Sequence, residues 1–301
     1  METAKWMSLL PGETPSCLVN LPGTHDSSTQ FIVLPVLFSC QDMSIAAQLE
    51  TGVRFLDIRL ELRDGRFRAV HGIGSCRARR GPGAPPLYFE DIWAMCSAFL
   101  AANPGETVFM SVKMDAGDNA DIFFAEFFRQ HIAGQDLWFL ENRYPALGEC
   151  RGKIVLVRRC GTGSAKGCTD LNTGINLSNW PEQGSTESAE PLRCDIERLD
   201  GTPSGLEAVI QDRFRFPGKV KWERAAKPAL DAARPGAATL CLHFLSTFGR
   251  IAGPKINAKA VNRAFASYPL EPGRNVGWII LDFPTKSLCE KIIASNFQDV
   301  L

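Results

Sequence analysis

The chain has 301 residues, and its 33 Lys and Arg balance its 33 Asp and Glu, so its formal net charge is zero. A neutral chain does not gain affinity by neutralising a nucleic-acid backbone, and we expect no nucleic-acid partner. Hydrophobic residues make up 45% and charged residues 22%, which is typical of a globular protein with a sizeable core. The sequence has no apolar stretch of about 18 residues, which argues against a membrane-spanning helix.

The ten cysteines form no Cys-x-x-Cys pair and show no zinc-ligand spacing. Several lie inside apolar runs, where cysteine usually acts as a small buried hydrophobe. Cys160 and Cys168 lie in a glycine-rich loop and are sterically the freest to form a disulfide. The pattern favours a reducing compartment.

Eight short apolar or β-branched runs predict strands, and residues that recur at three and four predict helices at Tyr88–Ala102 and Ala120–Ile132. Alternating strands and helices indicate a parallel sheet buried on both faces. Eight strands indicate an α/β fold of the (β/α)8 TIM-barrel type, distorted because the second and third runs are too close for a crossover helix. The runs are Cys17–Pro22, Val53–Leu60, Phe67–His71, Thr107–Met114, Lys153–Arg159, Ala208–Asp212, Ala238–Leu245 and Val276–Phe283.

The stretches Gly161–Pro191 and Gly201–Gly205 are rich in turn residues and are predicted to be loops over one mouth of the barrel. The sequence contains no internal repeat and no linker that would separate two domains. We therefore expect residues 1–301 to form a single domain.

Polar residues follow the predicted strands at the ends that build the active sites of such barrels. Asp57 and Arg59 share one face of a strand that has no solvated side, so they must face the mouth or pair with each other. Because these strand ends meet at one face, the side chains are expected to converge. The other members of the set are His25, Asp26, His71, Lys113, Arg159, Asp212 and Asp282.

Two histidines of this set, His25 and His71, can supply a base and an acid on opposite sides of a reacting atom. The neighbouring cations suit an anionic substrate, and a phosphoryl group most of all. Carboxylates such as Asp26 and Asp282 can orient the imidazoles. The set therefore suits cleavage of a phosphodiester without a metal ion or other cofactor.

The remaining histidines are predicted to be structural. His131 lies on an amphipathic helix, and His243 alternates with apolar residues along a strand.

Several segments, in order along almost the whole chain, resemble the X domain of phosphatidylinositol-specific phospholipase C. The small single-domain bacterial form is the most similar. The segments are LPGTHDSST (Leu21–Thr29), GVRFLDIRL (Gly52–Leu60), VHG (Val70–Gly72), NPGETVFMSVK (Asn103–Lys113), RGKIVLVRR (Arg151–Arg159), IQD (Ile210–Asp212) and VGWIILDF (Val276–Phe283).

The resemblance implies an incompletely closed barrel and a metal-independent phospholipase C. His25 would be the general base that takes the proton of the inositol 2-hydroxyl, which attacks the phosphorus of the same molecule. His71 would be the general acid that protonates the diacylglycerol oxygen. The products would be diacylglycerol and inositol 1,2-cyclic phosphate, which is hydrolysed more slowly.

The same resemblance implies roles for the other residues of the set. Asp26 would assist the acid, Asp282 would hold the base, and Arg59 would contact a non-bridging phosphate oxygen. Phe214 stands where the bacterial family has an aromatic residue with a hydroxyl group, so its stacking face against the inositol remains and one hydrogen bond is lost. The residues that would hold the inositol hydroxyls are Lys113, Arg159 and Asp212.

Arg59 distinguishes two subtypes of the family. The resemblance to calcium-dependent relatives fails at this position, because they carry an acidic residue there. A guanidinium repels a dication and supplies its own positive charge, so we expect no metal site. Asp57 is interpreted as a buried partner of Arg59 or of another cation.

The segment Phe31–Phe38, FIVLPVLF, has no charge and directly follows the GTHDSST loop. It is predicted to be an exposed apolar finger or short helix that gives transient contact with phosphatidylinositol-containing membranes. Packing over the side of the barrel is the alternative. We expect a monomer. The first ten residues contain no signal-peptide-like run, which predicts a cytoplasmic protein with peripheral membrane contact, or a secreted one if a leader was trimmed.

Two other functions stay open at this point. One is a non-catalytic X-domain protein that binds inositol lipid. The other is a metal-dependent phosphodiesterase that acts on glycerophosphodiesters or sphingolipids, although such an enzyme would want an acidic ligand in place of Arg59.

Overall fold

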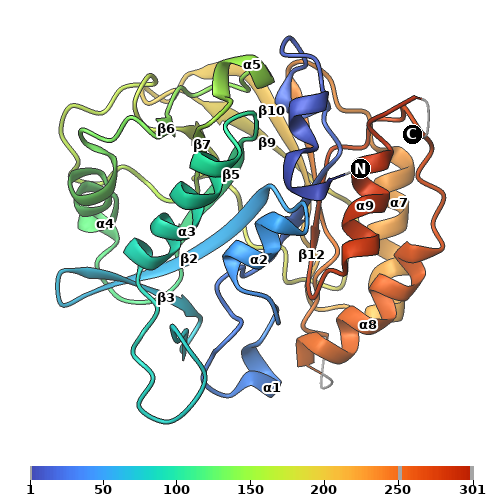
Figure 1. Cartoon of the computed structure of the whole chain (residues 1–301), viewed down its shortest axis with the longest axis horizontal. Coiled ribbons are helices and arrows are strands. Elements are labelled where there is room, and N and C mark those ends of the chain that lie inside the picture. Colours follow the sequence, from blue (N-terminus) through green and yellow to red (C-terminus); the bar gives the residue numbers. More distant parts are fainter. Residues whose placement is uncertain (1, 250–252, 299–301) are drawn as a thin grey trace.

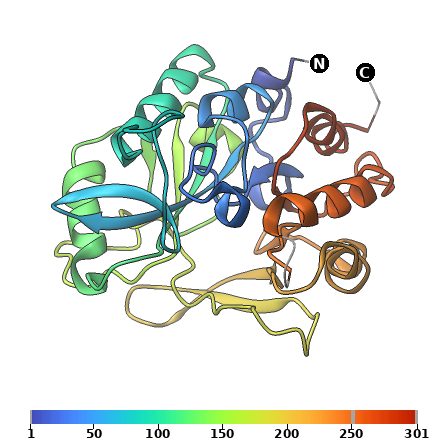
Figure 2. The same ribbon diagram turned by 90° about the horizontal axis from the view of Figure 1, so that it is seen from below.

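The computed structural model describes residues 2–249 and 253–298 and has an α/β architecture (Figures 1 and 2). A mostly parallel sheet curls into a barrel, in the order β6-β7-β5-β2-β1-β12-β11-β10-β9. The predicted fold class is confirmed. The strands are β1 (Leu21–Thr24), β2 (Phe55–Arg63), β3 (Arg66–His71), β4 (Gly74–Ser75), β5 (Val108–Met114), β6 (Trp138–Phe139), β7 (Ile154–Arg158), β8 (Ile175–Asn176), β9 (Leu192–Glu197), β10 (Pro203–Gln211), β11 (Thr239–Phe244) and β12 (Trp278–Leu281).

Helices cover the outside of the sheet (Figure 2). In the part of the chain that the structure describes, no helix is long and apolar enough to cross a bilayer. The α-helices are α1 (Pro35–Phe38), α2 (Ile45–Glu50), α3 (Phe89–Ala102), α4 (Ala120–Phe127), α5 (Leu147–Cys150), α6 (Gly218–Lys221), α7 (Lys227–Ala232), α8 (Gly253–Ala266) and α9 (Lys286–Ala294). Short 3-10 helices span Thr3–Lys5, Met7–Leu9 and Ser16–Leu18, and π-helical turns span Phe128–Ile132 and Trp222–Ala226.

The third predicted barrel strand is not a barrel strand. β3 pairs antiparallel with β2, and a two-residue turn joins them. Asp64 and Gly65 of this turn both have positive φ, at 52° and 73°, which is the geometry of the tight hairpin turn that Asp-Gly favours. β2 therefore extends beyond the barrel, and β3 brings His71 back to the mouth.

The first predicted strand, Cys17–Pro22, lies too early in the chain. Ser16–Leu18 is a 3-10 helix, and β1 begins at Leu21. The Asn20 side chain explains the break, because its Oδ1 accepts the backbone N–H of Val276 at 2.7 Å and its Nδ2 donates to the Arg274 carbonyl at 2.7 Å. These bonds fix the chain just before β1 enters the sheet.

Two of the predicted loops contain strand residues. β10 begins at Pro203, inside the stretch expected to be a turn, and an irregularity in its pairing with β9 falls between Pro203 and Leu206. The strand β9 was not predicted from the sequence. β9 is antiparallel to β10 and carries an exposed side, so it lacks the continuous apolar run that predicts a parallel strand. The two-residue strand β8 lies within the long loop 161–191.

The sheet does not close by backbone pairing between β9 and the β6–β8 side of the barrel, within the described residues. Hydrogen bonds from asparagine side chains connect β9 to the β6–β8 side instead. The Nδ2 groups of Asn142 and Asn176 donate to the Glu197 carbonyl at 2.9 and 3.0 Å, and Asn179 donates to the Asp195 carbonyl at 3.0 Å. Side-chain hydrogen bonds thus satisfy backbone acceptors that a closed ladder would have paired.

Aromatic rings fill the barrel interior. The Trp278 ring lies 4.6 Å from that of Phe109 and 5.5 Å from that of Phe55, between ring centroids. Phe55 in turn meets Phe244 at 6.4 Å. Gly23 of β1 makes room for this packing, because a Cβ there would lie 2.9 Å from the Cβ of Phe55. The barrel is therefore a packed core, with its functional space at one mouth.

A buried ion pair ties β2 to the segment before β5. Arg54 is fully buried and donates to Glu106 Oε2 from Nε at 2.9 Å and from Nη2 at 2.7 Å. Glu106 also accepts the backbone N–H groups of Met7 and Ser8. This network anchors the amino-terminal segment under the barrel, at the end opposite the mouth.

Replacing Arg54 by Met leaves the Glu106 carboxylate buried without its cation, and we expect a loss of about 3–5 kcal/mol in the free energy of unfolding. Urea unfolding followed by circular dichroism measures it. Arg63→Met, at the exposed end of β2, is the control and should change stability by less than about 0.5 kcal/mol. Equal losses in the two variants would contradict the assignment.

Candidate active site

A cavity of about 980 Å³ opens at the carboxyl ends of the barrel strands. Eight of the nine residues proposed from the sequence line it, and Asp26 lies behind them. The set is therefore brought together, although His71 arrives on an antiparallel strand. The eight are His25, Arg59, His71, Lys113, Arg159, Asp212, Phe214 and Asp282.

The Asp26 carboxylate lies between two imidazoles. Its Oδ2 is 3.0 Å from Nε2 of His25 and 3.2 Å from Nε2 of His71. The backbone of Asp26 has a φ of 44°, a left-handed conformation that costs energy in a residue other than glycine. Hydrogen bonds of the next residue fix it, since Ser27 N donates to the Asp57 carbonyl and Asp57 N donates to Ser27 Oγ. The strained turn after β1 thus aims both His25 and Asp26 into the site.

His25 is held from its other side by Asp282, the residue that follows β12. The distance from Nδ1 of His25 to Oδ1 of Asp282 is 2.8 Å. Gln41 fastens the two strand ends together, because its Nε2 donates to the carbonyls of His25 and Leu281. Both nitrogens of the His25 imidazole therefore contact a carboxylate, Nδ1 that of Asp282 and Nε2 that of Asp26.

The protonation of this pair suits a base. Burial, assisted by the positive charge of Arg59, holds the pKa of His25 well below its usual value, so the imidazole is neutral at pH 7. Burial and the nearby Asp26 raise the pKa of Asp282 well above its usual range. In its ionised form, Asp282 at Nδ1 stabilises the imidazolium that forms when His25 accepts a proton.

His71 is oriented by a backbone carbonyl. Its Nδ1 lies 2.9 Å from the carbonyl oxygen of Phe38, which fixes Nδ1 as the donor and leaves Nε2 facing Asp26. The rings of His25 and His71 lie 6.0 Å apart, edge to face. Their Nε2 atoms therefore flank a common space, as an acid and a base on either side of a reacting group require.

Arg59 is the central cation of the site. Its Nε lies 3.1 Å from Oδ1 of Asp26, and its Nη2 lies 3.1 Å from Oδ2 of Asp57. A third carboxylate, Asp115, is 3.7 Å away. Burial acts to lower the pKa of Arg59, but these carboxylates hold it well above its usual value. The guanidinium is thus permanently charged and fixed in position.

Asp57 is fully buried and shared by two cations, since Arg159 Nη1 lies 3.3 Å from its Oδ1. Although burial acts to raise it, the guanidiniums of Arg59 and Arg159 hold the pKa of Asp57 below its usual value. These contacts agree with the interpretation of Asp57 as a buried partner, and it serves Arg159 as well as Arg59.

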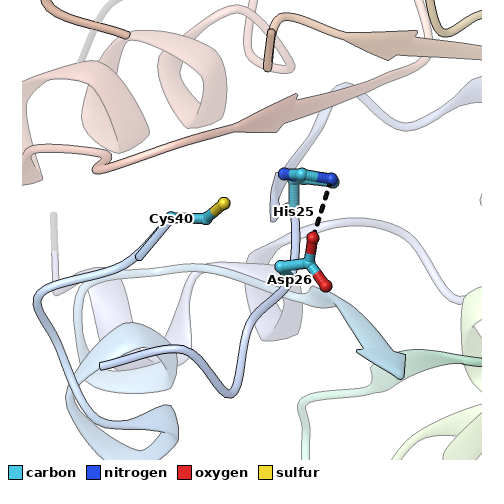
Figure 3. Close-up of side chains that lie close together, drawn as sticks. All are labelled: His25, Asp26 and Cys40. Atoms are coloured by element: carbon cyan, nitrogen blue, oxygen red, sulfur yellow. Dashed lines mark ion pairs between the residues drawn. The ribbon is translucent and has the colours of Figure 1, made fainter. Parts of the chain in front are cut away.

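The donor set does not suit a metal ion. His25, Asp26 and Cys40 each offer a ligand atom within 4.8 Å of the others. Figure 3 shows these three side chains close together. Burial and the neighbouring Asp282 hold the pKa of the Cys40 thiol well above its usual value, so it lacks the charge of a ligand thiolate. Asp26 already contacts the Arg59 guanidinium, which would repel a dication.

Several residues of the cavity were not predicted from the sequence, and three of them contact the predicted set. Asp115 follows β5 directly and binds Lys113 Nζ at 2.8 Å and the Gly72 backbone N–H at 2.7 Å, so the strand-end rule could have found it. Trp180 stacks on the Arg159 guanidinium at 3.5 Å, from a loop without a predictive pattern. Cys40 lines the cavity next to His71, and no sequence signal marks it.

The segment after β10 carries Asp212 and Phe214, and a buried lysine holds it in place through hydrogen bonds. Lys221 Nζ donates to Gln211 Oε1 at 2.8 Å and to the Arg213 carbonyl at 2.9 Å. Burial lowers the pKa of Lys221 to about 7 and raises that of Asp212 above its usual value. Both side chains of the segment line the cavity.

The other two histidines lie outside the cavity lining. The ring of His131 packs among phenylalanines, 4.7 Å from Phe89 and 5.3 Å from Phe127. His243 is buried and its Nε2 lies 2.8 Å from the Val276 carbonyl. Burial lowers the pKa of His243 to about 4. These surroundings agree with the structural interpretation of both residues. The ten cysteines, all within the described residues, are free, so Cys160 and Cys168 form no disulfide here.

Comparison with known proteins places these features in context. The family model for "Phosphatidylinositol-specific phospholipase C, X domain" matches residues 26–160. The chain is 32% identical over 296 residues to a 1-phosphatidylinositol phosphodiesterase of Staphylococcus aureus strain Newman, covering 92% of this chain and 87% of the relative. It is 24% identical over 309 residues to the Listeria monocytogenes enzyme of the same name, covering 98% and 85%.

Solved structures show the same fold. A mutant of the phosphatidylinositol-specific phospholipase C from S. aureus superposes with a TM-score of 0.78 at 24% identity, over 98% of each chain. The L. monocytogenes enzyme superposes with a TM-score of 0.72 at 25% identity, over 98% of this chain and 99% of that one.

Replacing Arg59 by Gln should raise the pKa of His25, because burial and the Arg59 charge are the two largest causes that hold it down. An NMR titration of the histidine Cε1–Hε1 signals measures it. The exposed Arg63→Gln variant on the same strand should leave the value unchanged. An unchanged or lowered pKa of His25 in the Arg59 variant would show that the guanidinium does not act on the imidazole.

Proposed function

This chain belongs to the phosphatidylinositol-specific phospholipase C family, and from that membership and the geometry of the cavity we propose that it cleaves phosphatidylinositol to diacylglycerol and inositol 1,2-cyclic phosphate. The observation that carries the proposal is the pair of imidazoles that share Asp26, with a fixed guanidinium beside them. The cavity takes residues from His25 to Asp282, so we propose that residues 1–301 act as one catalytic domain.

The first half of the reaction uses His25. Its neutral Nε2 accepts the proton of the inositol 2-hydroxyl as the oxygen attacks the phosphorus of the same molecule. The positive charge that develops on the ring is stabilised by Asp282 at Nδ1. Because the nucleophile belongs to the substrate, no covalent bond to the protein forms.

The second half uses His71. It donates the proton from Nε2 to the diacylglycerol oxygen as the phosphorus–oxygen bond breaks. The ionised Asp26, 3.2 Å away, stabilises the protonated imidazole before transfer. Reversal of the roles, with water as nucleophile, would open the cyclic phosphate in a slower step.

Arg59 supplies the electrophile. Its guanidinium already lies against Asp26 and Asp57, so it needs little reorganisation to contact a non-bridging phosphate oxygen as charge accumulates there. A calcium ion would also provide positive charge, but the guanidinium occupies the place where the carboxylates converge. We propose that the reaction is metal-independent.

The far side of the cavity would hold the inositol ring. Lys113, Arg159 and Asp212 offer charged hydrogen-bonding groups to the ring hydroxyls, and Trp180 holds the Arg159 guanidinium flat. Phe214 offers a ring face for stacking and, lacking a hydroxyl, one hydrogen bond fewer than a tyrosine.

The substrate lies in a bilayer, and the segment Phe31–Phe38 borders the cavity mouth through Leu37 and Phe38. The structure ends this segment in the short helix α1 and exposes Leu34 at 57% and Val36 at 80%. We propose that this exposed apolar surface enters the membrane interface and brings the cavity mouth to the lipid.

Product analysis tests the proposed reaction. With phosphatidylinositol in mixed micelles and excess EDTA, phosphorus NMR should show inositol 1,2-cyclic phosphate, because Arg59 replaces the metal. His25→Ala should abolish the signal, whereas His131→Gln, outside the cavity, should retain it. Vesicle binding without turnover would favour a lipid-binding module, and activity that is lost in EDTA would favour a metal-dependent phosphodiesterase.

The pH dependence tests the role of Asp26. Burial raises the pKa of Asp26 to about 6, so this carboxyl is ionised above that pH and becomes protonated as the pH falls through it. The proton on His71 then loses its negative partner, and we expect kcat/KM to fall below about pH 6. In Asp26→Asn, kcat/KM should be low, and the fall of kcat/KM below about pH 6 should be absent. If kcat/KM of the variant still falls below about pH 6, a group other than Asp26 causes the pH dependence.

A further inference from the structure

A second hollow lies beside the exposed apolar segment, outside the catalytic cavity. It has a volume of about 680 Å³ and shares no lining residue with the cavity of the active site. One wall is apolar and includes Phe31, Val33 and Pro35. The opposite wall is the loop that follows β4 and carries Arg77, Arg79 and Arg80.

The wall formed by Arg77, Arg79 and Arg80 is positively charged, and no carboxylate among the described residues neutralises it by an ion pair. Within residues 2–249 and 253–298, none of these three guanidiniums lies within 4.0 Å of a carboxylate, whereas those of Arg63, Arg66 and Arg143 do have such partners. Arg79 and Arg80 are exposed, and Arg77 is held in part by the Ala84 carbonyl. No acidic residue lines the hollow.

The two walls form one structural unit. The Val33 backbone N–H donates to the Ser75 carbonyl at 3.2 Å, and that of Arg77 donates to the Phe31 carbonyl at 2.6 Å. The guanidinium of Arg80 lies 6.0 Å from the Phe31 ring centroid. Figure 1 shows the loop between β3 and α3 on the same lower edge of the molecule as α1. A surface that approaches one wall therefore meets both.

We propose that this hollow binds the phosphate group of an anionic glycerophospholipid other than the substrate, and so anchors the protein to negatively charged bilayers. The proposal rests on the proposed function in one respect, namely that the adjacent apolar segment meets a membrane. A lipid phosphate matches the arginine wall in charge, and the glycerol and upper acyl region match the apolar wall beside it. The protein as a whole is neutral, so long-range attraction would have to come from this patch.

The consequence is that bilayer charge controls access to the catalytic cavity. Anionic lipid would hold the mouth at the interface while leaving the catalytic residues untouched. Substrate that is dissolved in water would be cleaved at a rate independent of Arg79 and Arg80.

Vesicle sedimentation with the full chain tests the inference. The probe is large vesicles of phosphatidylcholine, with or without phosphatidylglycerol and without any inositol lipid. Because each basic side chain near an anionic surface contributes about fivefold in affinity, Arg79→Gln combined with Arg80→Gln should weaken binding to the charged vesicles about thirtyfold. Binding to pure phosphatidylcholine should not change.

The matched control removes the same charge elsewhere. Lys5→Gln combined with Lys153→Gln lies at the opposite end of the barrel, because Lys5 precedes the segment held by Glu106 and Lys153 directly precedes β7. It should bind both kinds of vesicle as the unmodified protein does. Equal weakening in the two double variants, or no weakening in the arginine variant, would overturn the proposal.

Two further measurements distinguish a lipid site from a free-anion site and from an extension of the active site. Inorganic phosphate at constant ionic strength should not release the protein from the vesicles, and release would assign the hollow to free anions instead of lipid. Cleavage of a water-soluble inositol phosphodiester should be equal in the arginine variant and the unmodified protein, and a loss there would overturn the separation from the active site. If no inositol ester is cleaved by either protein, the proposed function fails while the vesicle result still decides the lipid site.

Discussion

The site depends on the guanidinium of Arg59, a positive charge that belongs to the protein itself and, unlike a metal ion, cannot dissociate. Arg59 projects from the barrel strand β2 and is held by Asp26, Asp57 and Asp115, so its charge is fixed before any substrate arrives. Removing this charge from water is costly, and the carboxylates offset that cost. They also tie Arg59 to the histidines, because Asp26 contacts His25 and His71 with its other oxygen. The guanidinium and the two imidazoles, which we propose as base and acid, are thereby coupled through one carboxylate.

Burial gives this arrangement its chemical character. The same desolvation that keeps His25 neutral raises the pKa of Asp26 to about 6 and raises that of Asp282 as well. A neutral base beside a permanent cation is what an intramolecular attack on phosphorus requires, because the base must accept a proton while the cation stabilises the developing charge. The backbone strain at Asp26 is consistent with a turn that is shaped for this purpose.

The sequence predicts the barrel class and the convergence of the strand-end residues well, because continuous apolar runs and a polar residue at each run's end have a direct physical meaning. It predicts less where side chains decide the outcome. The hairpin that delivers His71 depends on the Asp64–Gly65 turn. Asp-Gly is itself a hairpin signal, but the expectation of eight barrel strands leaves no place for a hairpin. Trp180 comes from a segment with no periodic pattern. The strand β9 does alternate apolar and charged residues, but it has no continuous apolar run of the kind that predicts a barrel strand. The contact of Asp57 with Arg159 joins residues from different strands, and no spacing in the sequence reveals it.

The most direct test of the account is the kcat/KM of Arg59→Met on phosphatidylinositol, measured in chelator and again with added calcium. The account predicts a loss of about 10²–10³-fold, equivalent to about 2.7–4 kcal/mol of transition-state stabilisation, that calcium does not restore. Activity close to that of the unmodified protein, or recovery upon addition of calcium, would contradict the claim that a guanidinium acts here in place of a metal ion.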